Sequence, residues 1–310
     1  METTHPDKLA AIKTVLRQNN QYEQMTVDQI RETLAKQSAS IAPIPGVMTK
    51  ELEDDGVNGE WLWSAELGAD HRLVKQVLLY YHGGGFIAGT SRDYRDLASR
   101  LALTSGVKVL TADYRLAPEH PYPAANEDAL SAYRWLLNQG YAPENIVLGG
   151  DSIGASLALM TLLALRDNGE PLPAGAFLLS PHSDLVHLDG ESYKSNAALD
   201  PTGSLEGNRR ILDAYLREQA ADEPYPAVLS PLRQDLNGLP PLLIQVGDQE
   251  VLLSDATRLA ERAQEAGVAV TLEVWEEMWC VFQMLASFLP EARQALENVG
   301  KFTCKMLCKQ

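Results

Sequence analysis

The chain has few cysteines, no long apolar run and no excess of positive charge, and each lack excludes a class of protein. Among its 310 residues only Cys280, Cys304 and Cys308 are cysteines, too few for a disulfide framework. Because no run of about 18 apolar residues occurs, we expect no membrane span, and the N-terminus lacks the features of a secretory signal. The formal net charge of −16 argues against nucleic acid as a partner. We therefore expect a cytoplasmic protein.

The apolar residues that are present fall into short runs separated by helical patterns. Hydrophobic residues make up 45% of the chain, enough to bury a large core. Continuous apolar runs indicate strands that are covered on both faces, as in a parallel sheet. These runs occupy residues 77–81, 107–112, 146–148, 176–179 and 242–246, and helical segments at 93–103, 127–138, 153–166 and 254–266 alternate with them. This order predicts an α/β fold with a mostly parallel central sheet flanked by helices.

Two stretches do not follow this alternation. Residues 1–45 are predicted to be polar helices, and residues 184–236 are polar and rich in proline turns. We predict that these two stretches form a helical cap over a core made of residues 46–183 and 237–310. Residues 268–275 alternate apolar and polar side chains, which is typical of an edge strand. Such an edge could pair with a second copy, so a homodimer through residues 268–275 is an expectation.

A serine lies where a predicted strand meets a predicted helix. Residues 150–154 read Gly-Asp-Ser-Ile-Gly, directly after the strand at 146–148 and before an apolar helix. Small residues around the serine permit a sharp turn that exposes its hydroxyl, and the start of the helix faces the oxygen of the carbonyl group that this hydroxyl would attack. We therefore predict that Ser152 is a nucleophile and that the Ile153 amide helps to stabilise the resulting oxyanion.

A glycine-rich segment follows another core strand. Residues 82–86 read His-Gly-Gly-Gly-Phe. Backbone amides in such a turn can point at a developing negative oxygen, and we predict that Gly83 and Gly84 are two oxyanion donors. His82 is expected to fix the turn through a hydrogen bond and to take no part in proton transfer.

These segments, together with Asp-Tyr-Arg-Leu-Ala-Pro-Glu-His-Pro-Tyr-Pro-Ala-Ala at 113–125, resemble the hormone-sensitive-lipase family of α/β-hydrolases. The resemblance covers roughly residues 45–305. It implies an α/β-hydrolase fold with a helical cap, a carboxylesterase activity on a small-molecule ester or lactone, and no cofactor or metal. Segment 113–125 is expected to be scaffolding, with buried hydrogen bonds from Asp113, Arg115 and His120.

The resemblance also implies an acid after the strand that ends near residue 246. Asp248 and Glu250 both qualify, and the family pattern, aligned on Leu252 and on the Ala-Gly-Val at 266–268, favours Glu250. Its role is to hold and polarise the base.

The expected histidine base is missing. The family carries it after the last strand, and here Cys280 stands in the matching segment Glu-Met-Trp-Cys-Val-Phe at 277–282. A thiol cannot accept a proton from the serine on one atom while donating to the acid from another, as imidazole does. His182 is an alternative base. We also predict that His182 and Phe86 contact the substrate.

Three functions remain open on this basis. The first is an esterase scaffold that Cys280 inactivates or strongly impairs. The second is a small-molecule binding protein, because the plant gibberellin receptor resembles the same family and lacks the histidine. The third is cysteine chemistry at Cys280, which lacks basic neighbours to stabilise a thiolate.

Overall fold

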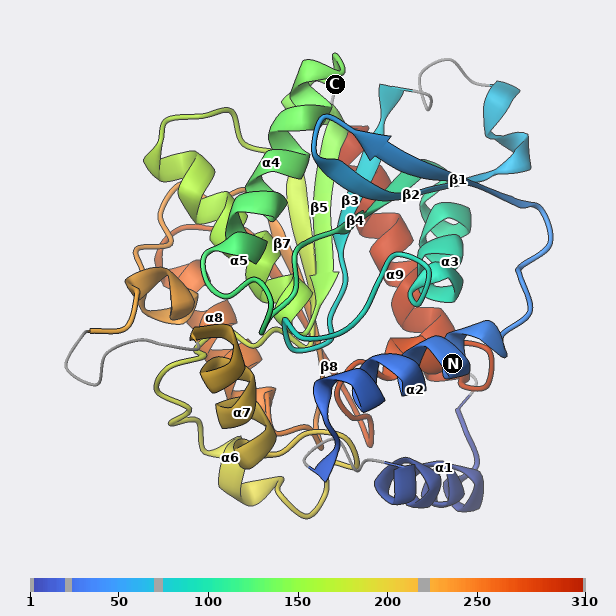
Figure 1. Cartoon of the computed structure of the whole chain (residues 1–310), viewed down its shortest axis with the longest axis vertical. Coiled ribbons are helices and arrows are strands. Elements are labelled where there is room, and N and C mark those ends of the chain that lie inside the picture. Colours follow the sequence, from blue (N-terminus) through green and yellow to red (C-terminus); the bar gives the residue numbers. More distant parts are fainter. Residues whose placement is uncertain (1–2, 20–23, 70–74, 217–223, 309–310) are drawn as a thin grey trace.

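The computed structural model describes residues 3–19, 24–69, 75–216 and 224–308, and an eight-stranded sheet runs through their centre (Figure 1). The strands are β1 (Val47–Asp54), β2 (Val57–Ser64), β3 (Val77–Tyr81), β4 (Lys108–Asp113), β5 (Ile146–Asp151), β6 (Gly175–Leu179), β7 (Leu242–Gly247) and β8 (Val270–Trp275). Their order is β1-β2-β4-β3-β5-β6-β7-β8. β2 is antiparallel to β1 and β4, and the strands from β4 to β8 are parallel.

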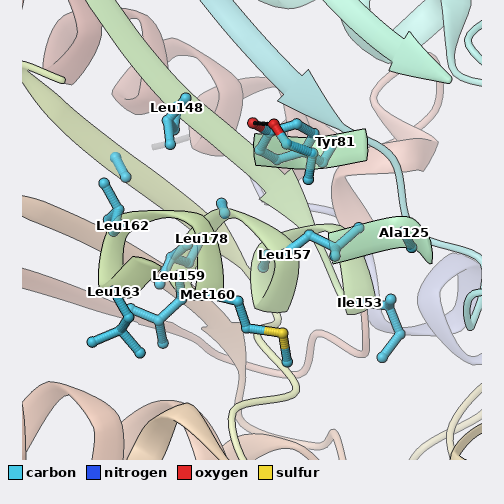
Figure 2. Close-up of a cluster of buried hydrophobic side chains, with 14 of the residues drawn as sticks. Tyr81, Ala125, Leu148, Ile153, Leu157, Leu159, Met160, Leu162, Leu163 and Leu178 are labelled. Carbon is cyan, nitrogen blue, oxygen red and sulfur yellow. Dashed lines mark hydrogen bonds between the residues drawn. The ribbon is translucent and has the colours of Figure 1, made fainter. Parts of the chain in front are cut away.

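Helices cover both faces of the sheet because its central strands are apolar on both faces. One face packs on α3 (Arg95–Ser105) and α9 (Pro290–Leu307), and the other on α4 (Ala124–Asn138), α5 (Ile153–Asp167) and α8 (Leu253–Glu265). Figure 2 shows leucines of α5 packed with Tyr81, Leu148 and Leu178 from β3, β5 and β6. α5 is buried almost all round, which holds its first residue in a fixed place.

This architecture confirms the predicted α/β fold. The predicted strand at residues 77–81 coincides with β3, and the other predicted core strands differ from the observed bounds by one to three residues. β5 continues to Asp151, so the strand leads directly into the serine turn.

β8 is an edge strand, as predicted, but the predicted alternation of buried and exposed side chains fails at its last two residues. Val274 is 49% exposed, whereas Trp275 is buried. The cause is the chain that follows: Phe282 from the 3₁₀ turn Phe282–Leu285 packs on the Trp275 ring with centroids 5.6 Å apart. The homodimer through residues 268–275 stays a prediction, which sedimentation of the purified protein would test.

The two stretches outside the alternation are helical where they are described. They contain α1 (Pro6–Asn19), α2 (Val27–Ala39), α6 (Ser192–Ser195), α7 (Leu205–Leu216) and the 3₁₀ turns Ala227–Leu229 and Pro231–Arg233. α1, α2, α6 and α7 gather at the lower end of the molecule in Figure 1. In the described residues no helix combines the length and the apolar character needed to cross a bilayer.

Candidate active site

Ser152 lies at the sharp turn between β5 and α5. Its φ of 50° and ψ of −117° fall where residues with a side chain are rarely found. The Ser152 amide donates to the carbonyl oxygen of Leu179, at the end of β6, at 2.8 Å. The hydroxyl makes no capping hydrogen bond within the described chain, so this serine is not an ordinary helix cap. A strained turn with a free hydroxyl is the geometry of a nucleophile elbow.

Glycines let this turn pack directly on the end of β3. A Cβ at Gly154 would collide with the carbonyl oxygens of Tyr81 and His82. A Cβ at Gly150 would collide with the backbone of Gly154 and of Tyr81. The elbow and the start of the glycine segment therefore meet backbone to backbone, which places residues 82–85 beside Ser152.

The Asp151 carboxylate anchors the glycine segment. It is 2% exposed and accepts hydrogen bonds from the Tyr80 hydroxyl at 2.7 Å, the Gly83 amide at 2.9 Å and the Tyr94 hydroxyl at 3.2 Å. Burial raises the pKa of Asp151 to about 6, although these hydrogen bonds oppose the shift. Because its N–H already binds Asp151, Gly83 cannot donate to an oxyanion, and the prediction for Gly83 is wrong.

The next amides along the segment are not engaged. Gly84 and Gly85 have φ values of 104° and 67°, in the left-handed region that favours glycine. Across the described residues, no acceptor binds the amides of Gly84, Gly85 or Ile153. Ile153 is the first residue of α5, whose positive end adds to the attraction for an anion.

Residues 113–125 pack against the glycine segment and form hydrogen bonds with its backbone. The Tyr114 ring stacks on His82 with centroids 4.3 Å apart, and its hydroxyl donates to the His82 carbonyl at 2.8 Å. The Ala117 amide donates to the carbonyl of Phe86 at 2.8 Å. The ring atom Nδ1 of His82 lies 2.7 Å from the Gly83 carbonyl oxygen, as expected for a residue that fixes the turn.

The predicted buried hydrogen bonds of residues 113–125 are only partly present. Asp113 is partly buried and accepts from the amide and the hydroxyl of Ser91 at 2.5 and 2.9 Å. Arg115 and His120 are exposed, and Arg115 forms surface ion pairs with Glu127 and Asp128. The prediction of buried hydrogen bonds from Arg115 and His120 is wrong, because these side chains point out of the loop rather than into it.

Glu250 is fully buried in the loop after β7. One carboxylate oxygen, Oε1, accepts from the Ser180 hydroxyl at 3.0 Å and from the Gly247 amide. The other oxygen, Oε2, has no hydrogen-bond partner in the described part of the chain. Burial raises the pKa of Glu250 well above its usual range, and the charge of Asp200 raises it further.

The competing carboxylate lies in different surroundings. Asp248 is only partly buried, and the charges of Lys13, Glu276 and Glu277 act on it. Burial raises the pKa of Asp248, and the Glu277 amide opposes the shift. Among the described residues no hydrogen bond joins its carboxylate to Ser180 or to the backbone after Cys280, whereas the Ser180 hydroxyl joins Glu250 to the Val281 amide.

Cys280 is a neighbour of Glu250, since each affects the pKa of the other. The Val281 amide donates to the Ser180 hydroxyl at 2.9 Å, which ties the Cys280 segment to Glu250 through one oxygen. Desolvation raises the pKa of the Cys280 thiol well above its usual value, and the Glu250 and Asp200 charges raise it further. The thiol is therefore protonated at neutral pH, which argues against cysteine chemistry.

The two residues predicted to contact substrate, His182 and Phe86, do not line the cavity described below. His182 is 1% exposed, and burial lowers its pKa to about 4, so it is a weak base. Phe86 is fully buried with its ring stacked on Tyr215 at 3.7 Å. Both side chains are buried, so substrate contact by His182 and Phe86 stays a prediction.

A cavity of about 240 Å³ lies beside the glycine segment instead. Its walls come from α2, from Gly84, Gly85, Ile87 and Ala88, from Tyr94, and from residues between 202 and 211 around the start of α7. Gly84 and Gly85, whose amides bind no acceptor among the described residues, both line it.

A family model described as the α/β-hydrolase fold matches residues 78–284. This chain belongs to the α/β-hydrolase family. An acetyl-hydrolase of Streptomyces hygroscopicus is 45% identical to it over 239 residues, 77% of this chain and 79% of that protein. An esterase of Acinetobacter venetianus is 38% identical over 262 residues, 84% of each chain.

The same family is found among solved structures. A crystal structure of an esterase from the bacterial hormone-sensitive-lipase family aligns with a TM-score of 0.90 and 41% identity, covering 98% of this chain and 99% of that one. The predicted resemblance to the hormone-sensitive-lipase family is therefore confirmed, and this α/β-hydrolase is of the carboxylesterase type.

Sequence reasoning missed the residues that hold the acid loop of this hydrolase. Ser180 has a φ of 47° at the end of β6, and its hydroxyl links Glu250 to Val281. The amide group of Asn196 donates to the carbonyls of Asp248 and Glu250, each at 2.9 Å. A polar residue at the carboxyl end of a core strand is the signal that could have identified Ser180.

Proposed function

We propose that this carboxylesterase-type hydrolase acts on short-chain esters or lactones through Ser152, and that Cys280 in the base position strongly impairs its turnover. One observation carries the proposal: the strained Ser152 turn packs against a glycine segment whose amides at Gly84 and Gly85 bind no acceptor in the described part of the chain. Such amides beside a free hydroxyl serve acyl transfer.

In the proposed reaction the Ser152 oxygen attacks the carbonyl carbon of the ester. Negative charge develops on the carbonyl oxygen, where the amides of Gly84, Gly85 and Ile153 stabilise it. Gly85 takes the place predicted for Gly83, because Asp151 already uses the Gly83 amide. The alcohol leaves, and water then hydrolyses the acyl group from Ser152.

The attack requires a base, and the chain offers none at the usual place. Glu250 keeps its acid environment, and its unpaired Oε2 corresponds to the oxygen that would accept an imidazole N–H. Burial raises the pKa values of both Glu250 and Cys280, and the raised pKa of the Cys280 thiol makes it a poor substitute for imidazole. Loss of the base in a serine hydrolase costs on the order of 10⁶-fold in turnover.

Residues 1–45 and 184–236 would act as the cap that selects the substrate. Side chains from α2 and α7 line the cavity beside Gly84 and Gly85. Asn196 and Asp200, both from the second cap stretch, bind the backbone of the acid loop at residues 248–251. The cap therefore supports the acid as well as enclosing the substrate.

The same cavity favours a second candidate, a small-molecule binding protein without turnover. Its walls are mainly apolar and α2 lies across it, an arrangement that could retain a ligand. A binding protein needs no catalytic base, so the absence of histidine at position 280 would not impair this function.

Covalent labelling with a fluorophosphonate tests the proposal. We expect Cys280→His to be labelled rapidly at Ser152, the unaltered chain to be labelled slowly, and Ser152→Ala in the Cys280→His chain to remain unlabelled. Mass spectrometry of the peptide that contains residue 152 reads the result. A folded Cys280→His chain that binds small esters but takes no label would contradict the hydrolase proposal and support the binding protein.

A further inference from the structure

Asp200, in the second cap stretch, joins two parts of the site. It is 6% exposed, and its Oδ1 accepts from the amides of Thr202 and Gly203, each at 2.9 Å, and from the Thr202 hydroxyl at 3.0 Å. The other oxygen, Oδ2, accepts from the Val251 amide at 2.9 Å. Thr202 and Gly203 line the cavity, and Val251 follows Glu250 in the chain. One carboxylate therefore ties the cavity wall to the acid loop.

The cavity wall and the acid loop are also in direct contact at this carboxylate. A Cβ at Gly203 would lie 2.7 Å from Asp200 Oδ2 and 2.9 Å from a methyl group of Val251. Val251 belongs to a small buried cluster with Tyr193, and Cys280 packs against the same cluster. Asp200 is thus fixed against the loop on which residue 280 packs.

Several ionisable groups act on residue 280. Desolvation raises the pKa of the Cys280 thiol, and the charges of three carboxylates add to this shift: Glu250, Asp200 and Asp151. Cys280 in turn acts on the Tyr193 hydroxyl, whose pKa burial raises. Burial also raises the pKa of Asp200, whereas hydrogen bonds from three amides and a hydroxyl favour its ionised form. The surrounding carboxylates therefore favour a positive charge at position 280, which an imidazole could carry.

We propose that Asp200 is a positioning residue for the acid and the base of this hydrolase, because it holds the acid loop through the Val251 amide and places a negative charge near residue 280. The inference rests on the proposed function, in which an imidazole at position 280 would be the base. This imidazole becomes positively charged when Ser152 attacks the ester, and Asp200 stabilises that charge in addition to Glu250.

A pH titration by NMR, with ring-labelled histidine, tests the proposal in the Cys280→His chain. The unaltered chain lacks the introduced imidazole, so comparison of the two spectra assigns its signal. Asp200→Asn removes a negative charge, and the pKa of the introduced imidazole should fall by about one pH unit. The acid limb of kcat/KM for p-nitrophenyl butyrate should move to lower pH by the same amount, because only the neutral imidazole acts as a base.

Asn196→Ala is the matched control for loosening of the acid loop. An asparagine at position 200 has a single acceptor oxygen, so Asp200→Asn also weakens one of the two connections. Asn196→Ala likewise removes hydrogen bonds to this loop, those to the carbonyls of Asp248 and Glu250, but it changes no charge. In this control kcat should fall while the pKa of the introduced imidazole stays in place.

An imidazole pKa that does not respond to Asp200→Asn, or that Asn196→Ala lowers equally, would overturn the inference. The titration requires no turnover, so it reads Asp200 separately from the hydrolase proposal. A shifted pKa in a folded Cys280→His chain without esterase activity would support the placement of the Asp200 charge and contradict the proposed function.

Discussion

At the scale of single residues, the site combines groups that the sequence identifies with groups that it does not. Motif spacing singled out Ser152 and Cys280 and favoured Glu250 over Asp248, and the structure brings Glu250 and Cys280 together through the Ser180 hydroxyl. Ser180 lies 70 residues from Glu250 in the chain, so no local pattern could reveal that contact. The hydrogen bond from the Gly83 amide to Asp151 could not be predicted from the sequence either, because it depends on the packing of β3 beside β5.

The contribution of Glu250 should depend on the residue at position 280. With histidine there, Glu250→Gln would remove the charge that orients and stabilises the imidazolium, and kcat should fall by about 10⁴-fold. With cysteine there, the same substitution should cost far less, because no imidazole is present to polarise. Steady-state rates of the four chains would measure the difference, and equal costs in both backgrounds would contradict the role given to Glu250.

At the scale of elements, the decisive contact is that of the β5–α5 turn with the end of β3. The alternation of apolar runs and helical patterns predicts both elements, and the Gly-Asp-Ser-Ile-Gly motif predicts a tight turn between them. It does not predict that Gly154 contacts the carbonyl oxygens of Tyr81 and His82. This contact, rather than the turn alone, sets the serine beside the glycine segment.

Gly154→Ala adds only one methyl group, yet it should displace the turn that carries Ser152. Its Cβ would collide with backbone that cannot rotate away, and overpacking of this kind costs about 1–3 kcal/mol in the free energy of unfolding. Displacement of the elbow should also slow fluorophosphonate labelling of Ser152 in the Cys280→His chain.

Gly106→Ala supplies the control. Gly106 caps α3 with a φ of 68° and has open space around it, so alanine there should cost about 1 kcal/mol without changing the labelling rate. Labelling of the Gly154→Ala chain at the rate of this control would contradict the packing argument.

At the scale of the whole molecule, buried carboxyl groups make stability depend on pH. Asp255 is 1% exposed beneath the amides of Ser183 and Asp184, and burial raises its pKa to about 7 from an ordinary value of 3.8. Between these pKa values the folded state binds the proton more strongly than the unfolded state. The contribution of Asp255 to stability is thus fully present below about pH 4 and is lost as pH rises to about 7.

Asp255→Asn should remove this dependence while keeping the oxygen that accepts both amides. The free energy of unfolding of the variant, relative to the unaltered chain, should rise by about 1.4 kcal/mol per pH unit between about pH 4 and pH 7. Urea denaturation at a series of pH values would measure it, and two parallel stability curves would show that Asp255 titrates normally.

The fold as a whole was predictable, whereas the cavity beside Gly84 and Gly85 was not. The positions of the core strands and helices along the chain follow from runs of apolar residues whose length and spacing are visible in the sequence, whereas the order of the strands in the sheet comes from the structure. The cavity depends on how α2 and α7, separated by more than 160 residues, pack over Gly84 and Gly85. Phe86 adjoins the glycine segment in sequence, yet its side chain is fully buried and does not line the cavity.

The measurement that tests the account most directly is the turnover of p-nitrophenyl butyrate by the Cys280→His chain. Ser152, the unengaged amides and Glu250 are all in place, so restoring one imidazole should raise kcat by several orders of magnitude, up to about 10⁶-fold. Ser152→Ala in the same chain should abolish the gain. A folded Cys280→His chain no faster than the unaltered one would contradict the claim that the site lacks only its base.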